Sequence, residues 1–212
     1  MVILYTLQNG DFINLKDIKI IKKEKVYVNL TNKCPCACTF CLRDTKEMVE
    51  TNSLWLKREP SAQEIIGEFE KYDLDQFNEV IFCGYGEPTI RLYDIIEIAK
   101  YLKRRTNIPL RINTNGLADL IHKKDTAPLL EGLIDTVSIS LNASNAEEYL
   151  RITRNKFGLE SFDAMLKYAV NCKKYVPKVV FTVVDCIGEE EIKACQKVCD
   201  NIGIPLRVRP FE

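Results

Sequence analysis

Six short β-rich runs divide most of the chain, and helical patterns fill the intervals between them. The runs begin at Val26, Asn78, Pro109, Asp135, Lys178 and Pro205. Most of the intervals are close to the roughly 30 residues that one strand–helix–strand unit occupies. Repeated units of this kind form a parallel sheet with right-handed crossovers. We therefore expect an α/β protein.

The length of the chain limits which parallel fold it can adopt. A closed eight-stranded barrel usually needs ~250 residues, and this chain has 212. The spacing alone allows either an open six-stranded barrel or a doubly wound sheet. Helix starts are indicated by two capping boxes, at 61–64 and 144–147. Before the first parallel strand, the pattern predicts a β-hairpin with a tight turn at Asn9-Gly10.

Polar side chains recur on one face of four predicted strands. The rows are Tyr27, Asn29 and Thr31; Arg111, Asn113 and Asn115; Ser138, Ser140 and Asn142; and Arg207 with Arg209. A closed barrel is normally filled by branched aliphatic residues. The central rows therefore favour a wet cavity, although such residues can also satisfy one another or face solvent. For the two arginines of the last strand both interpretations stay open.

Composition excludes several classes of protein. The formal net charge is zero, which gives no strong signal for nucleic-acid binding. No apolar run is long enough to span a membrane, and the first residues do not resemble a signal peptide. The single histidine, His122, has no evident partner for a Ser-His or Cys-His dyad. Nine cysteines do not pair completely, so we expect a cytoplasmic protein with reduced thiols.

Four cysteines lie close together in the stretch TNKCPCACTFCLRD. Cys34, Cys38 and Cys41 are separated by three and two residues, with Cys36 between them. A structural zinc site normally takes two separated pairs of ligands, and a redox dithiol would leave Cys34 unexplained. Three thiolates can instead hold three corners of a cubane iron–sulfur cluster and leave one iron open. Cys36 lies outside this pattern and is interpreted as a bystander.

Other unusual stretches also fall at predicted strand ends, where parallel folds bind ligands. They are GYGEP (84–88), NTNG (113–116) and SLNAS (140–144). GYGEP is not a dinucleotide loop, because GxGxxG would need glycine where Thr89 stands. The remaining cysteines are expected to be buried core thiols. They are Cys83, Cys172, Cys186, Cys195 and Cys199.

The two strongest motifs resemble those of the radical S-adenosylmethionine (SAM) superfamily. The cysteine stretch matches its CxxxCxφC motif, with Phe40 as the aromatic residue, and GYGEP is similar to its GGEP motif. The resemblance covers essentially the whole chain. It implies a partial (β/α)6 TIM-like barrel, here residues 26–212, with residues 1–25 as an N-terminal β-hairpin extension. More narrowly, FCGYGEPTIRL, NTNGLADLIH, SISLNAS and LRVRPF resemble the small TatD-linked radical SAM proteins.

The resemblance also implies a chemistry and a set of site residues. Cys34, Cys38 and Cys41 would bind a [4Fe-4S] cluster, and SAM would chelate the open iron. Reductive cleavage of SAM would give a 5′-deoxyadenosyl radical that takes a hydrogen atom from the substrate. The residues expected to bind SAM are Phe40, Gly84, Tyr85, Gly86, Glu87, Pro88, Asn113, Asn115, Ser138, Ser140, Asn142 and Arg154.

Several alternatives remain open at the level of sequence. The expected partners are a small-molecule or peptide substrate and a reductant such as flavodoxin or ferredoxin, with no membrane partner. Within the superfamily, the small size also resembles glycyl-radical activases and 7-carboxy-7-deazaguanine synthases. A different class is a non-catalytic module in which Cys34, Cys36, Cys38 and Cys41 hold zinc or iron. That module predicts four-thiolate coordination and no affinity for SAM.

Overall fold

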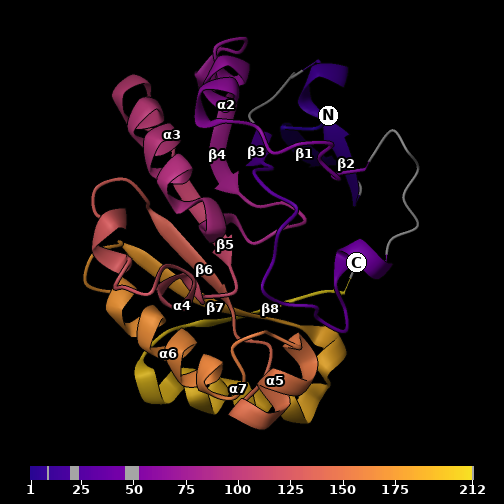
Figure 1. Ribbon diagram of the computed structural model, residues 1–212, viewed down its shortest axis with the longest axis vertical. Coiled ribbons are helices and arrows are strands. Elements are labelled where there is room, and N and C mark those ends of the chain that lie inside the picture. The colour runs from indigo at the N-terminus through magenta and orange to yellow at the C-terminus, as the bar shows by residue number, and fades with distance from the viewer. Residues whose placement is uncertain (9, 20–23, 46–52, 212) are drawn as a thin grey trace.

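One eight-stranded sheet forms the centre of the protein in the computed structural model (Figure 1), which describes residues 1–8, 10–19, 24–45 and 53–211. The strand order is β2-β1-β3-β4-β5-β6-β7-β8. The parallel part comprises β3 (Glu24–Val28), β4 (Phe77–Phe82), β5 (Leu110–Thr114), β6 (Thr136–Ser140), β7 (Lys178–Val184) and β8 (Leu206–Arg209). These six strands, in chain order and all parallel, confirm the predicted partial barrel. Each begins within two residues of its predicted start.

Amphipathic helices cover the outer face of the sheet. They are α2 (Ala62–Phe69), α3 (Leu92–Arg105), α4 (Ala118–His122), α5 (Ala146–Thr153), α6 (Glu160–Cys172) and α7 (Glu189–Ile202), and the short α1 (Leu42–Thr45) follows the cysteine loop. Figure 1 shows α2 and α3 beside β4 and β5, and α5, α6 and α7 grouped at the other end of the curved sheet. Alternate strand residues such as Val137 and Ile139 are fully buried in one core with these helices. The hydrophobic effect of this burial fixes which face of each strand points inward.

The predicted helix starts are correct at one site and displaced at the other. Ser61 and Glu64 form a reciprocal capping box at the start of α2. For α5 the N-cap is Asn145 rather than Ser144, because the Asn145 side chain accepts a hydrogen bond from the Glu148 backbone N–H. The Ser144 N–H instead donates to Glu191 at the start of α7. An Asn can cap as well as a Ser, so sequence alone did not separate the two.

The N-terminal hairpin extends the same sheet. β1 (Leu4–Gln8) pairs antiparallel with β2 (Asp11–Asn14) and with β3. Its aromatic residues form a second small core in which Tyr5, Phe12 and Tyr85 are buried together. Asn9, half of the predicted tight turn, lies outside the described residues, whereas Gly10 has a φ of 84°. The proposed boundary between residues 25 and 26 stays a prediction.

The expected core thiols are only partly found. Cys172, Cys195 and Cys199 are fully buried, as predicted. Cys186 is exposed, so that prediction is wrong; it lies in a short 3-10 turn (Asp185–Ile187) after β7 rather than in a strand or helix. Cys83 is half-buried and follows β4 on the inner face of the sheet, which no helix covers.

Candidate functional site

The cysteine stretch forms a loop between β3 and α1 at the carboxyl end of the sheet. Cys34, Cys38 and Cys41 are half-buried, and Cys36 is buried. The Cys36 thiol hydrogen-bonds the thiols of Cys34 and Cys38, and this interaction lowers the pKa of both. The same contacts, together with burial, raise the pKa of Cys36. Low-pKa thiols are the ones that bind metals, so the donor set fits an iron–sulfur cluster at Cys34 and Cys38.

Arg43 lies directly beside these thiols. Its Nε atom donates to Cys41 Sγ over 3.1 Å, and Nη2 donates to the Cys36 carbonyl oxygen over 3.3 Å. Its positive charge also helps to lower the pKa of Cys34 and Cys38. A cation here stabilises thiolates and the negative charge of any cluster that they hold. Sequence analysis did not identify Arg43, although its position two residues after the last cysteine was a usable signal.

The end of α5 holds one side of the cysteine loop. Backbone hydrogen bonds of 2.9–3.0 Å join Ala37 N–H to Thr153 O, Thr39 N–H to Ile152 O, and Lys156 N–H to Pro35 O. These contacts bring the segment 152–156 against the loop although the two are far apart in sequence. Arg154 lies within this segment, in a left-handed conformation with φ 46°. Its side chain is exposed, so it would have to turn inward to bind SAM as predicted.

The GYGEP loop after β4 contacts the other side of the cysteine loop. The N–H groups of Gly86 and Glu87 donate to the carbonyl oxygens of Thr31 and Lys33, over 3.0 and 2.8 Å. A Cβ atom on Gly86 would lie 2.3 Å from the Thr31 oxygen, and one on Gly84 would lie 2.2 Å from Asn29 Oδ1. Such distances are far below van der Waals contact, so only glycine allows this approach. The ammonium group of a bound amino acid is a donor only, so in this loop it could bind backbone carbonyl oxygens but not N–H groups.

Glu87 is buried, and four hydrogen bonds satisfy its carboxylate. Oε1 accepts from Thr89 N–H (3.0 Å), Thr89 Oγ1 (2.6 Å) and Thr114 Oγ1 (2.7 Å), and Oε2 accepts from Asn115 N–H (2.8 Å). Burial raises the pKa of Glu87 and these bonds oppose the shift. With its oxygens occupied, the carboxylate ties the GYGEP loop to the end of β5. Sequence analysis missed Thr89 and Thr114 in this role.

The predicted polar residues lie on the inner face of the strands, near the same end. Ser138 and Asn142 are buried, and Asn113, Asn115 and Ser140 are half-buried. The Asn113 and Asn142 Oδ1 atoms are buried and have no hydrogen-bond partner among the described residues. Buried acceptors normally have donors, and the hydroxyl groups of a ribose are suitable ones. These two atoms therefore fit SAM.

Two of the predicted polar residues on the inner face are bound to other protein groups. Asn29 is fully buried, and its amide donates to the Val2 and Leu54 carbonyl oxygens. Arg111 forms an ion pair with Glu79 over 3.1 Å. Part of the expected wet cavity is therefore occupied by side chains that already have protein partners, although Asn29 Oδ1 and Arg111 Nε have none among the described residues. The Asn115 amide donates to Cys36 Sγ over 3.5 Å, so it links the end of β5 to the cysteine loop.

The other predicted residues differ in their surroundings. Phe40 is half-buried against the main core, beside Cys41. The Tyr85 ring lies in the second core, edge-on to Phe12 and Trp55. Pro88 is buried at the first position of a 3-10 turn. Tyr149, which sequence analysis missed, donates its hydroxyl to the Asn115 carbonyl oxygen over 3.3 Å. Nothing near Tyr149 in the sequence signalled this contact, because it depends on the docking of α5.

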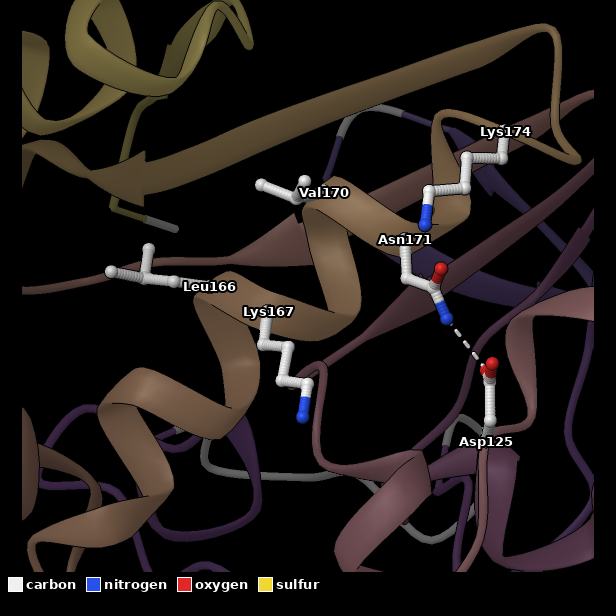
Figure 2. A pocket seen from close by; sticks show the side chains of 6 residues that line it. All are labelled: Asp125, Leu166, Lys167, Val170, Asn171 and Lys174. Carbon is white, nitrogen blue, oxygen red and sulfur yellow. Dashed lines mark hydrogen bonds between the residues drawn. The ribbon is translucent and has the colours of Figure 1, made fainter.

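A pocket of about 440 Å³ lies elsewhere, on the outer surface at α6 (Figure 2). Its lining includes Leu166 and Lys167 of α6, and Asn171 donates to Asp125 over 2.7 Å. No site residue lines it. Within the described part of the chain, no group of three or more His, Cys, Asp or Glu residues is arranged to hold a single metal ion. None of the described helices has the length and apolarity needed to cross a membrane.

Several curated proteins are similar to this chain in sequence. A probable GTP 3′,8-cyclase of Thermococcus kodakarensis is 30% identical over 187 residues, which is 87% of this chain and 56% of the relative. A protein of Methanocaldococcus jannaschii, provisionally named as a glycyl-radical enzyme activating enzyme, is 28% identical over 205 residues, covering 91% of this chain and 76% of its own. The chain spans about half the length of the GTP 3′,8-cyclases that it matches.

Solved structures share the fold. Streptococcus suis SuiB bound to S-adenosylmethionine superposes with a TM-score of 0.62 and 18% identity over 88% of this chain and 40% of SuiB. The anSMEcpe structure with bound AdoMet gives 0.63 and 18%, over 87% of this chain and 51% of that one. The sequence profile described as the Radical SAM superfamily matches residues 28–198, from the end of β3 to within α7. The chain therefore belongs to the Radical SAM superfamily, whose members use a [4Fe-4S] cluster and SAM.

Proposed function

We propose that this protein is a radical SAM enzyme in which Cys34, Cys38 and Cys41 hold the [4Fe-4S] cluster. The observation that carries the proposal is the position of the cysteine loop, fixed between the GYGEP loop and the end of α5 at the carboxyl end of the sheet. Ligands of parallel α/β folds bind at this end. The finer assignment, to the TatD-linked subfamily, is supported by the motifs that follow β4, β5 and β6.

The chain's own residues would position SAM rather than react with it. Carbonyl oxygens of residues 84–87 would accept the ammonium protons, and Asn113 and Asn142 would accept ribose hydroxyls through their unpartnered Oδ1 atoms. Phe40 would pack beside the adenine, and Ser138, Ser140 and Asn115 would complete the inner face. Arg154 would reach the carboxylate if its side chain turned inward.

When bound, the cluster supplies the electron that cleaves SAM to methionine and a 5′-deoxyadenosyl radical, which takes a hydrogen atom from the substrate. The protein's part is orientation and the exclusion of water. Its electron donor would be a small reductant such as flavodoxin or ferredoxin. The names of its relatives include GTP cyclisation and glycyl-radical activation, and we do not transfer either reaction to this chain.

The test is reductive cleavage of SAM by the reconstituted protein. After anaerobic reconstitution with iron and sulfide, dithionite and SAM should yield 5′-deoxyadenosine and methionine in equal amounts, measured by liquid chromatography. A matched preparation of Cys38→Ala should yield neither. A wild-type protein with an intact cluster and no 5′-deoxyadenosine would contradict the proposal.

One observation favours a second candidate, the non-catalytic four-thiolate module. Cys36 is not remote from the other thiols, because it hydrogen-bonds those of Cys34 and Cys38. If Cys36 were a ligand, replacing it would remove the metal. The Cys36→Ala variant therefore separates the two candidates.

A further inference from the structure

Three arginines lie on the inner face of the barrel, opposite the face that the described helices cover. Arg111 belongs to β5, and Arg207 and Arg209 belong to β8. Their strand neighbours Leu110 and Ile112 are fully buried on the outer face, and Leu206 packs against the same core. Since strand residues alternate between faces, the three arginine side chains lie on the inner face, where Arg207 is exposed and Arg111 and Arg209 are half-buried. We call them the inner-face arginine cluster.

The cluster converges although β5 and β8 are separated in the sheet by β6 and β7. Burial raises the pKa of Tyr27 on β3, and the charges of Arg111 and Arg207 oppose that shift. Burial likewise raises the pKa of Cys83 after β4, and Arg209 and Arg111 oppose it. The charges of Arg111 and Arg207 therefore reach Tyr27, and those of Arg111 and Arg209 reach Cys83. The curvature of the sheet brings its last strand near its first parallel strands.

The positive charge of the cluster is only partly compensated. Arg111 pairs with Glu79, whose carboxylate also lies 3.7 Å from Lys25. Among the described residues, neither Arg207 nor Arg209 has an ion pair within 4.0 Å. Asp185, at the end of β7, accepts a hydrogen bond from Phe211 N–H instead. Three guanidinium groups thus face one carboxylate.

Two of these groups also have unused donors. The Nε atoms of Arg111 and Arg209 are buried and have no hydrogen-bond partner among the described residues. A buried donor without an acceptor is costly, and a guanidinium fork binds carboxylate or phosphate oxygens in two parallel hydrogen bonds. Arg209 ends β8 and so lies near the strand ends at which SAM is proposed to bind, whereas Arg111 is the second residue of β5 and lies deeper in the barrel.

We propose that the inner-face arginine cluster binds an anionic group of the substrate, either a phosphate or a carboxylate. The inference rests on the proposed function, because it places the substrate beside SAM. Asn113 connects the two regions: it lies two residues beyond Arg111 on β5, and its side chain hydrogen-bonds the Cys83 thiol. A substrate anchored at the arginines would extend along this strand toward the cysteine loop. Because Glu79 is shared between Arg111 and Lys25, the charges of Arg207 and Arg209 are left for the ligand, which suits a dianion.

The binding test uses the reconstituted, SAM-saturated protein, titrated anaerobically by calorimetry with inorganic phosphate and, separately, malonate. We expect one site, and the tighter of the two ions identifies the phosphate or carboxylate class. Arg207→Gln and Arg209→Gln should each weaken binding by about tenfold or more, the usual cost of one charge-assisted contact. Arg209→Lys keeps the charge and loses the fork, so its affinity should fall between those of wild type and Arg209→Gln. Arg104→Gln, on the exposed side of α3, is the matched control and should bind as wild type.

A second variant reverses the sign of the effect. Glu79→Gln is nearly isosteric and releases Arg111 from its ion pair, so it should bind the anion more tightly than wild type. Absence of binding to wild type, equal loss in Arg104→Gln, or no gain in Glu79→Gln would each overturn the inference. The same titration without SAM gives a further check. If phosphate or malonate binds there and SAM then displaces it, the inference is also overturned, because the arginines would hold the SAM carboxylate.

The inference and the proposed function fail separately. The titration does not depend on turnover, and 5′-deoxyadenosine formation by wild type does not depend on the anion. A protein that cleaves SAM and binds neither ion retains the proposed function and refutes the anionic substrate. A protein that cannot cleave SAM refutes the proposed function whatever the titration gives.

Discussion

The hydroxyl group of Thr114 donates a hydrogen bond of 2.7 Å to Glu87 Oε1, which joins the end of β5 to the GYGEP loop. Thr89 shares the same acceptor oxygen. Glu87, the fourth residue of GYGEP, thereby connects the loop after β4 to the end of β5. The position of the whole site depends on this buried carboxylate.

Glu87→Gln should destabilise the fold and remove part of its pH dependence. Four groups donate to the Glu87 carboxylate, and an amide NH2 would replace one of its two acceptor oxygens. At least one donor would lose its acceptor, at a cost of about 1–3 kcal/mol. The pKa of Glu87 is raised above its ordinary value of 4.5. A raised carboxyl pKa contributes stability below the ordinary value, and that contribution is lost as the pH rises through the folded-state pKa. Urea unfolding of both proteins, from pH 4 upward, measures the difference.

The direction in which the stability difference changes with pH makes this prediction specific. The free-energy difference between wild type and Glu87→Gln should shrink as the pH rises from 4.5 through the folded-state pKa. A difference that grows over this range would mean that the carboxyl has a depressed pKa. Thr114→Val, which removes one donor and keeps the shape, is the companion variant and should cost less than Glu87→Gln.

Gly86→Ala should disturb the site, whereas Gly67→Ala should not. The added Cβ at residue 86 would lie 2.3 Å from the Thr31 oxygen and 2.6 Å from the Lys33 oxygen, both of which are backbone atoms that cannot turn away. We expect a loss of about 1–3 kcal/mol, typical of overpacking. Gly67 lies within α2 and has no atom within 4 Å of its added Cβ, so alanine there should stabilise by about 0.5–1 kcal/mol. Thermal unfolding of the two variants gives the comparison.

Cys36→Ala should retain the iron–sulfur cluster, and Cys38→Ala should lose it. Only Cys38 belongs to the proposed set of three ligands, although the thiols of Cys36 and Cys38 are in contact. Iron and sulfide content after reconstitution, with the visible absorption of the cluster, provides the measurement. Loss of iron in both variants would support the four-thiolate module instead.

Arg43→Gln should make the cluster harder to reduce. Removal of a positive charge that hydrogen-bonds Cys41 Sγ favours the oxidised, less negative form of the cluster. We expect the midpoint potential to fall by roughly 60 mV or less, equivalent to up to a tenfold change for one electron. Potentiometric titration followed by electron paramagnetic resonance would measure the shift. Arg151→Gln, on the exposed side of α5 and paired with Glu148, should leave the potential unchanged.

The repetitive part of the structure was predictable because it depends on local pattern. Alternating Val137, Ser138 and Ile139 specify one face toward the helices and one toward the inside of the barrel, and the six parallel strands begin within two residues of their predicted starts. The choice of N-cap at α5 was not predictable, since Ser144 and Asn145 are both good caps. Its outcome depends on Glu191, which takes the Ser144 N–H.

The site was predictable only where its residues lie close together in the sequence and form a recognisable motif. Three cysteines at fixed spacing and glycines at a strand end are local signals. The roles of Tyr149 and Thr114 depend on segments that meet only after folding, so no local pattern marks them. The inward rows had the same limitation: Asn29 and Arg111 were predicted on the correct face, but their partners Leu54 and Glu79 become apparent only in the fold.

The three main-chain bonds between the cysteine loop and segment 152–156 have a consequence for biosynthesis. The loop emerges from the ribosome early, and its docking partner follows after more than half of the chain has been made. Contacts of such long range form late. During translation the thiols would therefore remain open to oxidants and stray metals, and delivery of iron and sulfide would succeed only after α5 has closed over the loop.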